Sequence, residues 1–214
     1  MVASMYLLAT AIVPVFLLLV FTEYLWRANK LRGESARKLV HIIVGSYVAF
    51  WPFIISFEAI QAISAAFLLV VAVSLRFDIF KSIHGVARQT WGEVLFAIGI
   101  GLIAVLTDEP WVFAACILHM SVADGFAALA GIKWGKSNCY KVIGHTKSVL
   151  GTAVFWLCSI FITGTAIIMI PSLGAEHAYI IIWLPLLTAA AENIGIGGTD
   201  NVIVPVIVYL ALTI

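Results

Sequence analysis

The chain has 214 residues, of which 63% are hydrophobic and 11% are charged. A mean hydropathy of +1.12 excludes a water-soluble globular domain with a polar surface. The 12 basic and 11 acidic residues give a formal net charge of +1, so composition does not indicate a nucleic-acid partner. The composition therefore predicts an integral membrane protein.

Eight apolar stretches follow one another along the chain, at residues 5–26, 39–57, 59–75, 91–106, 111–132, 149–170, 178–194 and 202–214. None has the alternating pattern of a barrel strand, so we expect an all-α fold of about eight transmembrane helices. The last stretch is short for a full crossing, because a spanning helix needs about 20 residues. The connections are too short to separate domains, so a single polytopic domain over residues 1–214 is expected.

All the lysines and arginines fall in the connections after the first, third and fifth stretches. They are Arg27, Lys30, Arg32, Arg37, Lys38, Arg76, Lys81, Arg88, Lys133, Lys136, Lys141 and Lys147. The opposite turns carry only acidic charges. Because basic loops face the cytoplasm, we expect a multi-pass protein whose basic loops and active site lie on the cytoplasmic side.

Three carboxylates, those of Asp124, Glu192 and Asp200, lie within or beside apolar stretches. Lipid disfavours ionised side chains, so such residues usually have a function. With eight spans, the three converge at one depth on the side of the basic residues. Carboxylate oxygens beside ammonium and guanidinium groups suit a magnesium ion that carries a polyphosphate. We therefore predict a Mg²⁺ site here.

The segment from Gly131 to Thr152 mixes glycines, lysines and hydroxyl residues before the sixth stretch. Ser148 and Thr152 are expected in the first turns of the following helix, whose amide groups and positive dipole end favour an anion. Lys136, Lys141 and Lys147 can neutralise phosphates. This segment is predicted to contact a nucleotide.

Two further segments carry candidate site residues. Arg37, Lys38 and His41 open the second stretch, and their spacing places Arg37 and His41 on one helical face that can bind a phosphate or orient a hydroxyl. The link IGIGGTDN at residues 194–201 contains three glycines, which permit a close approach of backbone to a ligand. Non-helical backbone at membrane depth is tolerated where it lines a cavity or packs against protein.

Each candidate also has a structural interpretation. Lysine and arginine at helix ends determine topology and contact anionic lipids. His41 can be a packed histidine bonded to a carbonyl, and Asp124 can be an interhelical hydrogen-bonding residue. The convergence of three carboxylates favours the functional interpretation.

Four motifs occur in order along the chain: RKLVH at 37–41, ADGFAALAGIKWGK at 123–136, HTKSVLGT at 145–152, and Glu192 followed by TDNVIVP at 199–205. Together they resemble the motifs of the CTP-dependent lipid-alcohol kinases. This family contains dolichol, phytol and farnesol kinases and a fungal CTP-using diacylglycerol kinase, and it is related to phosphatidate cytidylyltransferases. The resemblance runs from Arg37 to the end of the sequence.

The resemblance assigns family positions to residues of this chain. The acidic residue of the G-D-x-x-A-x-x-x-G pattern falls on Asp124. The pattern associated with CTP falls on Lys147, Ser148, Gly151 and Thr152, and the late E…D-N-x-x-x-P pattern falls on Glu192, Asp200, Asn201 and Pro205. Two positions differ, since Ala123 replaces a glycine and Leu150 replaces a glutamate. The second change removes a possible metal or nucleotide contact.

The resemblance implies a kinase that moves the γ-phosphate of CTP to a lipid alcohol from the bilayer, such as a polyprenol (dolichol), phytol or diacylglycerol. Asp124, Lys147 and His41 would be catalytic, with Asp124 as proton acceptor, and Asp124, Glu192 and Asp200 would hold Mg²⁺. The nucleotide would contact Arg37, Lys38, Gly131, Lys136, Lys147, Ser148, Gly151, Thr152 and Asn201. Membrane lipids and a second copy of the chain are further expected partners, and nucleic acid is not.

Two other functions share some of these features. A cytidylyltransferase acting on a lipid phosphate would need nearly the same metal and nucleotide groups. The chain nevertheless lacks the Ser–basic pair–Asp signature expected near the C-terminus of that family. An ion- or proton-coupled transporter would use the carboxylates as a pathway, but it predicts inverted repeats, and the sequence shows none.

Overall fold

The computed structural model describes residues 2–30, 33–77 and 91–213. Its helices are α1 (Val2–Arg27), α2 (Gly33–Val48), α3 (Phe57–Phe77), α5 (Gly92–Leu106), α6 (Pro110–Leu118), α7 (Asp124–Trp134), α8 (Val149–Met169), α9 (Ile180–Ile194) and α10 (Asp200–Thr213). A π-helical turn, His119–Ala123, joins α6 to α7, and short 3-10 turns cover Trp51–Phe53 and Ala175–His177. The predicted helical fold is confirmed.

A helix lies in each of the eight predicted stretches, because α6, the π-helical turn and α7 form one continuous helix over Pro110–Trp134. The largest difference in bounds is at the second stretch, predicted at 39–57, where α2 covers Gly33–Val48. The polar residues before Val40 favour a helix and extend α2 toward the N-terminus. Pro52 lacks a backbone N–H and lies in the 3-10 turn that separates α2 from α3.

A short β-hairpin departs from the all-α prediction. Strands β1 (Cys139–Val142) and β2 (His145–Ser148) pair antiparallel, with Tyr140 opposite Lys147. The two turn residues, Ile143 and Gly144, have φ angles of +46° and +79°. Two consecutive residues with positive φ match the tight turns that join the strands of hairpins.

Four helices of the described residues are long and apolar enough to cross a membrane: Met5–Arg27, Phe57–Ser74, Pro110–Trp134 and Val149–Met169. Helices α5, α9 and α10 are apolar but shorter. The outer faces carry large apolar side chains, since Phe161 is 77% and Ile168 is 81% exposed. Such surfaces suit a lipid environment, and the protein is a membrane protein. The eight crossings stay a prediction.

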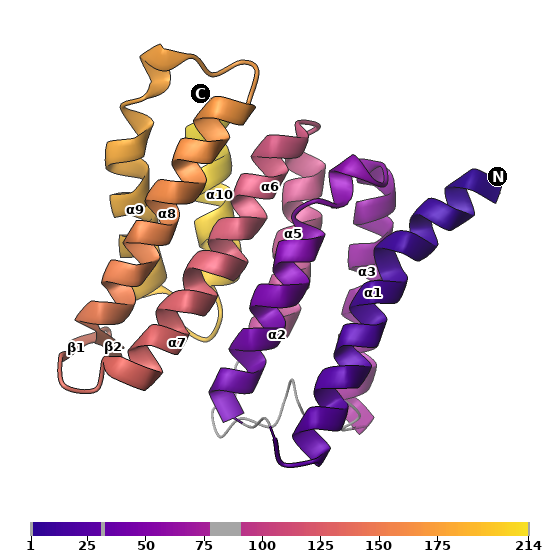
Figure 1. Cartoon of the computed structure of the whole chain (residues 1–214), viewed down its shortest axis with the longest axis horizontal. Helices are drawn as coiled ribbons and strands as arrows, with labels where there is room; N and C mark the ends of the chain where they lie inside the picture. Colours follow the sequence, from indigo (N-terminus) through magenta and orange to yellow (C-terminus); the bar gives the residue numbers. More distant parts are fainter. Residues whose placement is uncertain (1, 31–32, 78–90, 214) are drawn as a thin grey trace.

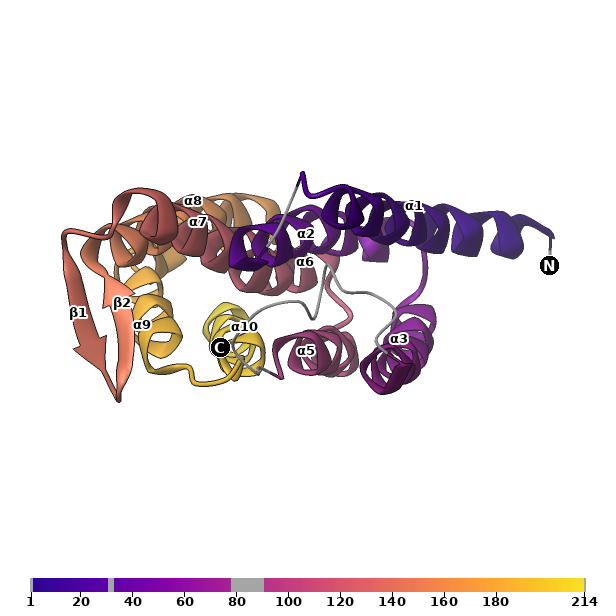
Figure 2. The ribbon, with the colours of Figure 1, turned by 90° about the horizontal axis from the view of Figure 1, so that it is seen from below.

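The helices form two layers (Figure 2). One layer contains α1, α2, α6–α7 and α8, and the other contains α3, α5, α10 and α9. Helix α10 packs against α5, α6 and α9, so it joins the layers at the centre of the bundle. The core between them is apolar and includes Phe113, Phe155 and Leu184, each fully buried.

The connections alternate between the two ends of the bundle (Figure 1). We call one end the hairpin end. It contains the link from α1 to α2, the start of α5, the β-hairpin and the link from α9 to α10. Both chain ends lie toward the opposite end (Figure 1). Arg32, Lys81 and Arg88 lie outside the described residues.

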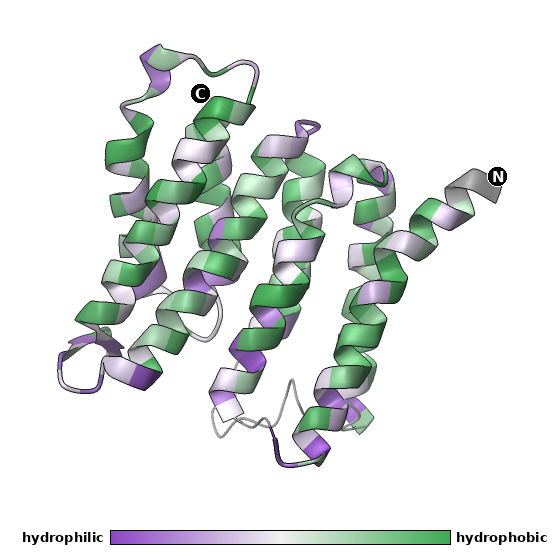
Figure 3. Ribbon diagram, in the orientation of Figure 1, coloured by the Kyte–Doolittle hydropathy of each residue, from purple (hydrophilic) through white to green (hydrophobic). Residues whose placement is uncertain are grey.

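Polar residues mark the hairpin end. Hydrophilic residues gather on the hairpin and at the lower ends of α1, α2 and α7, whereas the helix bodies are mostly hydrophobic (Figure 3). The structure thus places the described basic connections at one end, as the sequence predicts. Which side of a membrane this end faces stays a prediction.

Candidate active site

A cavity of about 800 Å³ lies at the hairpin end, and we call it the polar cavity. Its walls come from α2, α7, the hairpin, α8, α9 and α10, which are far apart in the sequence. Its volume falls in the range of small-molecule sites. The predicted site residues that line it are Arg37, Lys38, Asp124, Gly131, Lys147, Ser148, Gly151, Thr152, Glu192, Asp200 and Asn201.

Asp124 begins α7 directly after the π-helical turn and is only 5% exposed. Its carboxylate accepts a hydrogen bond from the ammonium of Lys38, which is also buried. The Nε2 atom of His41 lies 3.6 Å from Asp124 Oδ2 and donates to the carbonyl of Met120 at 2.9 Å. Turns of π-helix often occur at functional sites, because they displace a side chain from the regular helical position.

Lys147 and Glu192 form a second acid–base pair in the cavity wall. The Nζ atom of Lys147 donates to Glu192 Oε1 at 2.5 Å and to the Glu192 carbonyl at 3.1 Å. This contact connects β2 to α9. The sequence predicted both residues at the site, but as separate contacts to nucleotide and metal.

The glycine-rich link between α9 and α10 is fixed against the start of α5. Trp91 N–H donates to the Gly197 carbonyl at 3.0 Å, and Asn201 Nδ2 donates to the Gly92 carbonyl at 3.0 Å. Asn201 Oδ1 is buried and has no hydrogen-bond partner among the described residues. Buried acceptors without a partner are uncommon in native proteins.

The first turn of α8 is held by hydrogen bonds from side chains of the hairpin, α8 and α9. The Ser148 hydroxyl accepts a hydrogen bond from Gly151 N–H at 3.0 Å and caps the helix. Gly151 allows α8 to approach α7, because a Cβ there would lie 3.0 Å from the Ala127 carbonyl oxygen. Tyr140 donates to Asn193 Oδ1 at 2.8 Å, and Thr152 donates to the same oxygen at 3.2 Å.

Arg37, predicted to contact the nucleotide, interacts with two carboxylates of the protein. Its guanidinium forms an ion pair with Glu34 on α2, and it lies 4.0 Å from Glu93 Oε1 on α5. The Glu34 side chain also lines the polar cavity. The basic charge predicted here is therefore partly balanced within the protein.

Two predicted residues do not line the polar cavity. Lys136 is exposed, in the turn between α7 and the hairpin. His41 lines a neighbouring pocket and meets the site through Asp124. Leu150, which replaces the glutamate of the resembled family, is half-buried and does not line the cavity either. The residue at position 150 therefore makes no contact with the cavity in this structure.

Four other lining residues were not named individually as site candidates, although the last three lie in the segment 131–152 predicted to contact a nucleotide: Glu34, Cys139, His145 and Thr146. The last three belong to the hairpin, whose alternating side chains bring some residues to the cavity. The sequence marks the turn only by Gly144, because Ile–Gly is not one of the residue pairs typical of two-residue hairpin turns.

The three predicted metal ligands, Asp124, Glu192 and Asp200, all line the cavity, but the described residues contain no group of three His, Cys, Asp or Glu side chains placed to hold a metal ion. Asp200 interacts electrostatically with Asp124, Lys38 and Lys147. Mg²⁺ is usually bound by one or two carboxylates together with phosphate oxygens and water. A Mg²⁺ site in this cavity therefore stays a prediction.

Comparison with known proteins identifies the family. No family model matches the chain, and no solved structure matches it. The chain is 32% identical over 191 residues to a phytol kinase of Synechocystis sp., an alignment that covers 86% of this chain and 80% of the relative. The identity extends over most of both proteins, so the chain belongs to the family of lipid-alcohol kinases that contains phytol kinase.

Proposed function

We propose that this protein transfers the γ-phosphate of CTP to the hydroxyl of a long-chain isoprenoid alcohol, with phytol as the first candidate acceptor. The observation that carries the proposal is the polar cavity, which brings Asp124, Lys147, Glu192 and Asp200 together at one end of an apolar helical bundle. The relative is a phytol kinase. The choice of CTP rests on the resemblance of the 145–152 motif to the CTP-dependent kinases.

The cavity offers separate groups for the parts of a nucleotide. Lys147 and Lys38 supply positive charge for the phosphates. Asn201 lines the cavity beside Asp200 at the start of α10 and would contact the nucleotide there. Asp200 and Glu192 would hold Mg²⁺ with the phosphates, where the ion supplies charge neutralisation.

The transfer itself is an in-line displacement. The alcohol oxygen forms a bond to the γ-phosphorus while the bond from that phosphorus to the β,γ-bridging oxygen breaks, and CDP leaves. The alcohol proton passes to the carboxylate of Asp124. Lys38 holds this carboxylate in its ionised form by the buried ion pair, and the π-helical turn sets its position in the wall.

The cavity would face the cytoplasm, where nucleotides are available, with all eight helices crossing the membrane. Helices α2, α5, α9 and α10 are short for a bilayer, with 14 to 16 residues each. Their neighbours in the bundle are longer, and a locally thinned bilayer or flanking polar residues can accommodate the difference.

A label-transfer assay tests the proposal. Purified protein and Mg²⁺ are incubated with γ-labelled CTP or γ-labelled ATP, together with phytol, farnesol, diacylglycerol or phosphatidate, and the lipid phase is then extracted. We expect label in phytyl phosphate with CTP. Label in pyrophosphate with phosphatidate as acceptor would identify a cytidylyltransferase instead. Label in lipid from ATP alone would contradict the choice of CTP and leave the kinase assignment intact.

A further inference from the structure

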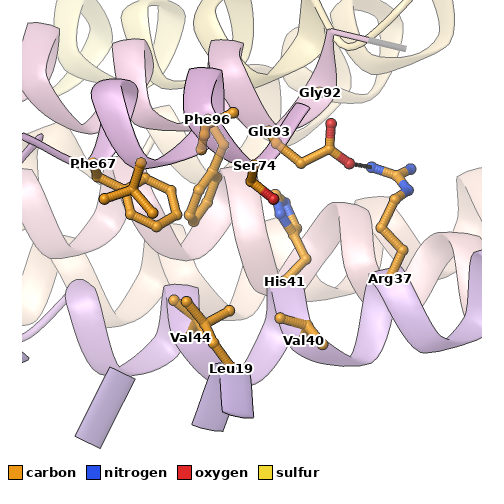
Figure 4. A pocket seen from close by; sticks show the side chains of 12 residues that line it. Leu19, Arg37, Val40, His41, Val44, Phe67, Ser74, Gly92, Glu93 and Phe96 are labelled. Carbon is orange, nitrogen blue, oxygen red and sulfur yellow. Dashed lines mark ion pairs between the residues drawn. The ribbon is translucent and has the colours of Figure 1, made fainter. Parts of the chain in front are cut away.

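A second, smaller pocket of about 60 Å³ lies between α1, α2, α3 and α5 (Figure 4), and we call it the apolar pocket. Most of its wall consists of aliphatic and aromatic side chains from these four helices, including Val71 and Phe96. Its polar residues are Arg37, His41, Ser74 and Glu93. An apolar pocket with a few polar groups is the usual form of a site for an amphipathic ligand.

The polar residues of this pocket adjoin the polar cavity. Arg37 and Gly92 line both spaces. The ring of His41 packs against Phe96 with 4.5 Å between ring centroids, while its Nε2 atom lies 3.6 Å from Asp124 Oδ2. His41 therefore stands between the apolar pocket and the carboxylate that faces the polar cavity. In Figure 4, Arg37 and Glu93 are joined by their ion pair beside His41.

The pocket also reaches the outer surface of the bundle. Val70 lines the pocket and is 45% exposed. It lies on α3, within one of the segments long and apolar enough to cross a membrane. A ligand can therefore enter from the hydrocarbon region without passing through water.

We propose that the apolar pocket binds the end of the acceptor alcohol next to the hydroxyl, with the hydroxyl beside Arg37, where the pocket adjoins the polar cavity and Asp124, and with the hydrocarbon chain leaving past Val70. This inference rests on the proposed kinase function and adds the location of the acceptor. The volume holds only the carbons nearest the hydroxyl. The rest of the chain lies against α3 in the bilayer, so the pocket selects a terminal hydroxyl and imposes no upper limit on chain length.

Two matched substitutions on α3 test the acceptor site. Val70 and Val73 are the same residue type, 45% and 49% exposed, but only Val70 lines the pocket. Val70→Trp places an indole at the opening, whereas Val73→Trp places one on the outer face. Because both positions are exposed, neither change is expected to prevent folding. The measurement is the KM for phytol and the KM for CTP in the label-transfer assay.

We expect Val70→Trp to raise the KM for phytol about tenfold, from the loss of roughly two buried carbon groups, with the KM for CTP unchanged. Val73→Trp should keep both values within about twofold of the wild type. Equal phytol KM values for the two variants would overturn the location of the acceptor while leaving the kinase function standing. Absence of transfer by the wild-type protein with every acceptor would reject the proposed function itself.

Discussion

Asp124 and Lys38 form an ion pair in which both side chains are less than a tenth exposed. Removing one partner of a buried pair leaves an uncompensated charge and costs about 3–5 kcal/mol. Lys147 and Glu192 repeat the arrangement on the other wall of the cavity. The basic groups of the site are thus held by carboxylates, and a triphosphate entering the cavity offers them additional anionic partners.

Two lysines that the sequence places at the nucleotide give the first prediction, because only Lys147 lines the cavity. Lys147→Met should lower kcat/KM for the nucleotide about 100-fold, because it removes charge-assisted hydrogen bonds to phosphate. Lys136→Met should change the same quantity less than about twofold, since Lys136 is exposed and does not line the cavity. Thermal unfolding in detergent checks that Lys147→Met remains folded despite the unpaired Glu192. Equal losses for the two variants would contradict the placement of the phosphates.

The candidate residues could be predicted from the sequence because charge in lipid is costly, and Asp124, Glu192 and Asp200 therefore stand out. Their partners could not be predicted. The pairing of Lys38 with Asp124 joins α2 to α7, and no spacing rule within one helix relates residues so far apart. The same holds for Arg37, whose contact with Glu93 depends on the packing of α2 beside α5.

At the scale of elements, three short irregular pieces build the site on regular helices. The π-helical turn positions Asp124, the hairpin positions Lys147, and the glycine-rich link positions Asp200 and Asn201. Composition marked both the link and the segment 131–152 that contains the hairpin, although it did not predict the strands. The π-helical turn has no sequence signal, because its residues His119–Ala123 continue an ordinary apolar stretch.

The glycine-rich link gives the second prediction. Gly198 has a φ of +99°, and a Cβ there would lie 2.6 Å from the Gly92 Cα atom, whereas Gly197 has a φ of +64° with open space around it. Gly197→Ala should therefore cost about 1 kcal/mol of stability through its backbone alone. Gly198→Ala should cost about 3 kcal/mol, because steric overlap adds to the backbone strain. Thermal unfolding of both variants in detergent measures the difference, and equal shifts would show that the link does not pack against α5.

At the scale of the whole molecule, the connections at each end of the bundle differ in the sign of their charges. The described basic connections lie at the hairpin end, and the acidic residue Glu176 lies in the link between α8 and α9 at the opposite end (Figure 1). The eight apolar stretches predicted eight helical segments, because hydrophobic length is a local property. The two-layer arrangement was not predictable, since it depends on which apolar faces pack together. Assembly into a homo-oligomer stays a prediction.

The orientation gives the third prediction. Cys139 on the hairpin is exposed, and Glu176 is an exposed position at the other end. In intact cells, a membrane-impermeant maleimide should label Glu176→Cys introduced into a Cys139→Ser background. It should label wild-type Cys139 only after the membrane is opened, because basic loops face the cytoplasm. Labelling of Cys139 in intact cells would place the hairpin end outside and contradict the orientation.

The measurement that tests the central claim most directly is transfer of label from γ-labelled CTP to phytol by wild-type protein and by Asp124→Asn. The substitution keeps the size of the side chain and removes the proton acceptor. We expect transfer to fall about 1,000-fold, and thermal unfolding in detergent measures how much stability the variant loses through the unpaired Lys38. Asp108→Asn, at an exposed loop position, should retain wild-type activity. Substantial transfer by Asp124→Asn would remove Asp124 from the reaction and contradict the assignment of the polar cavity as the site of phosphate transfer.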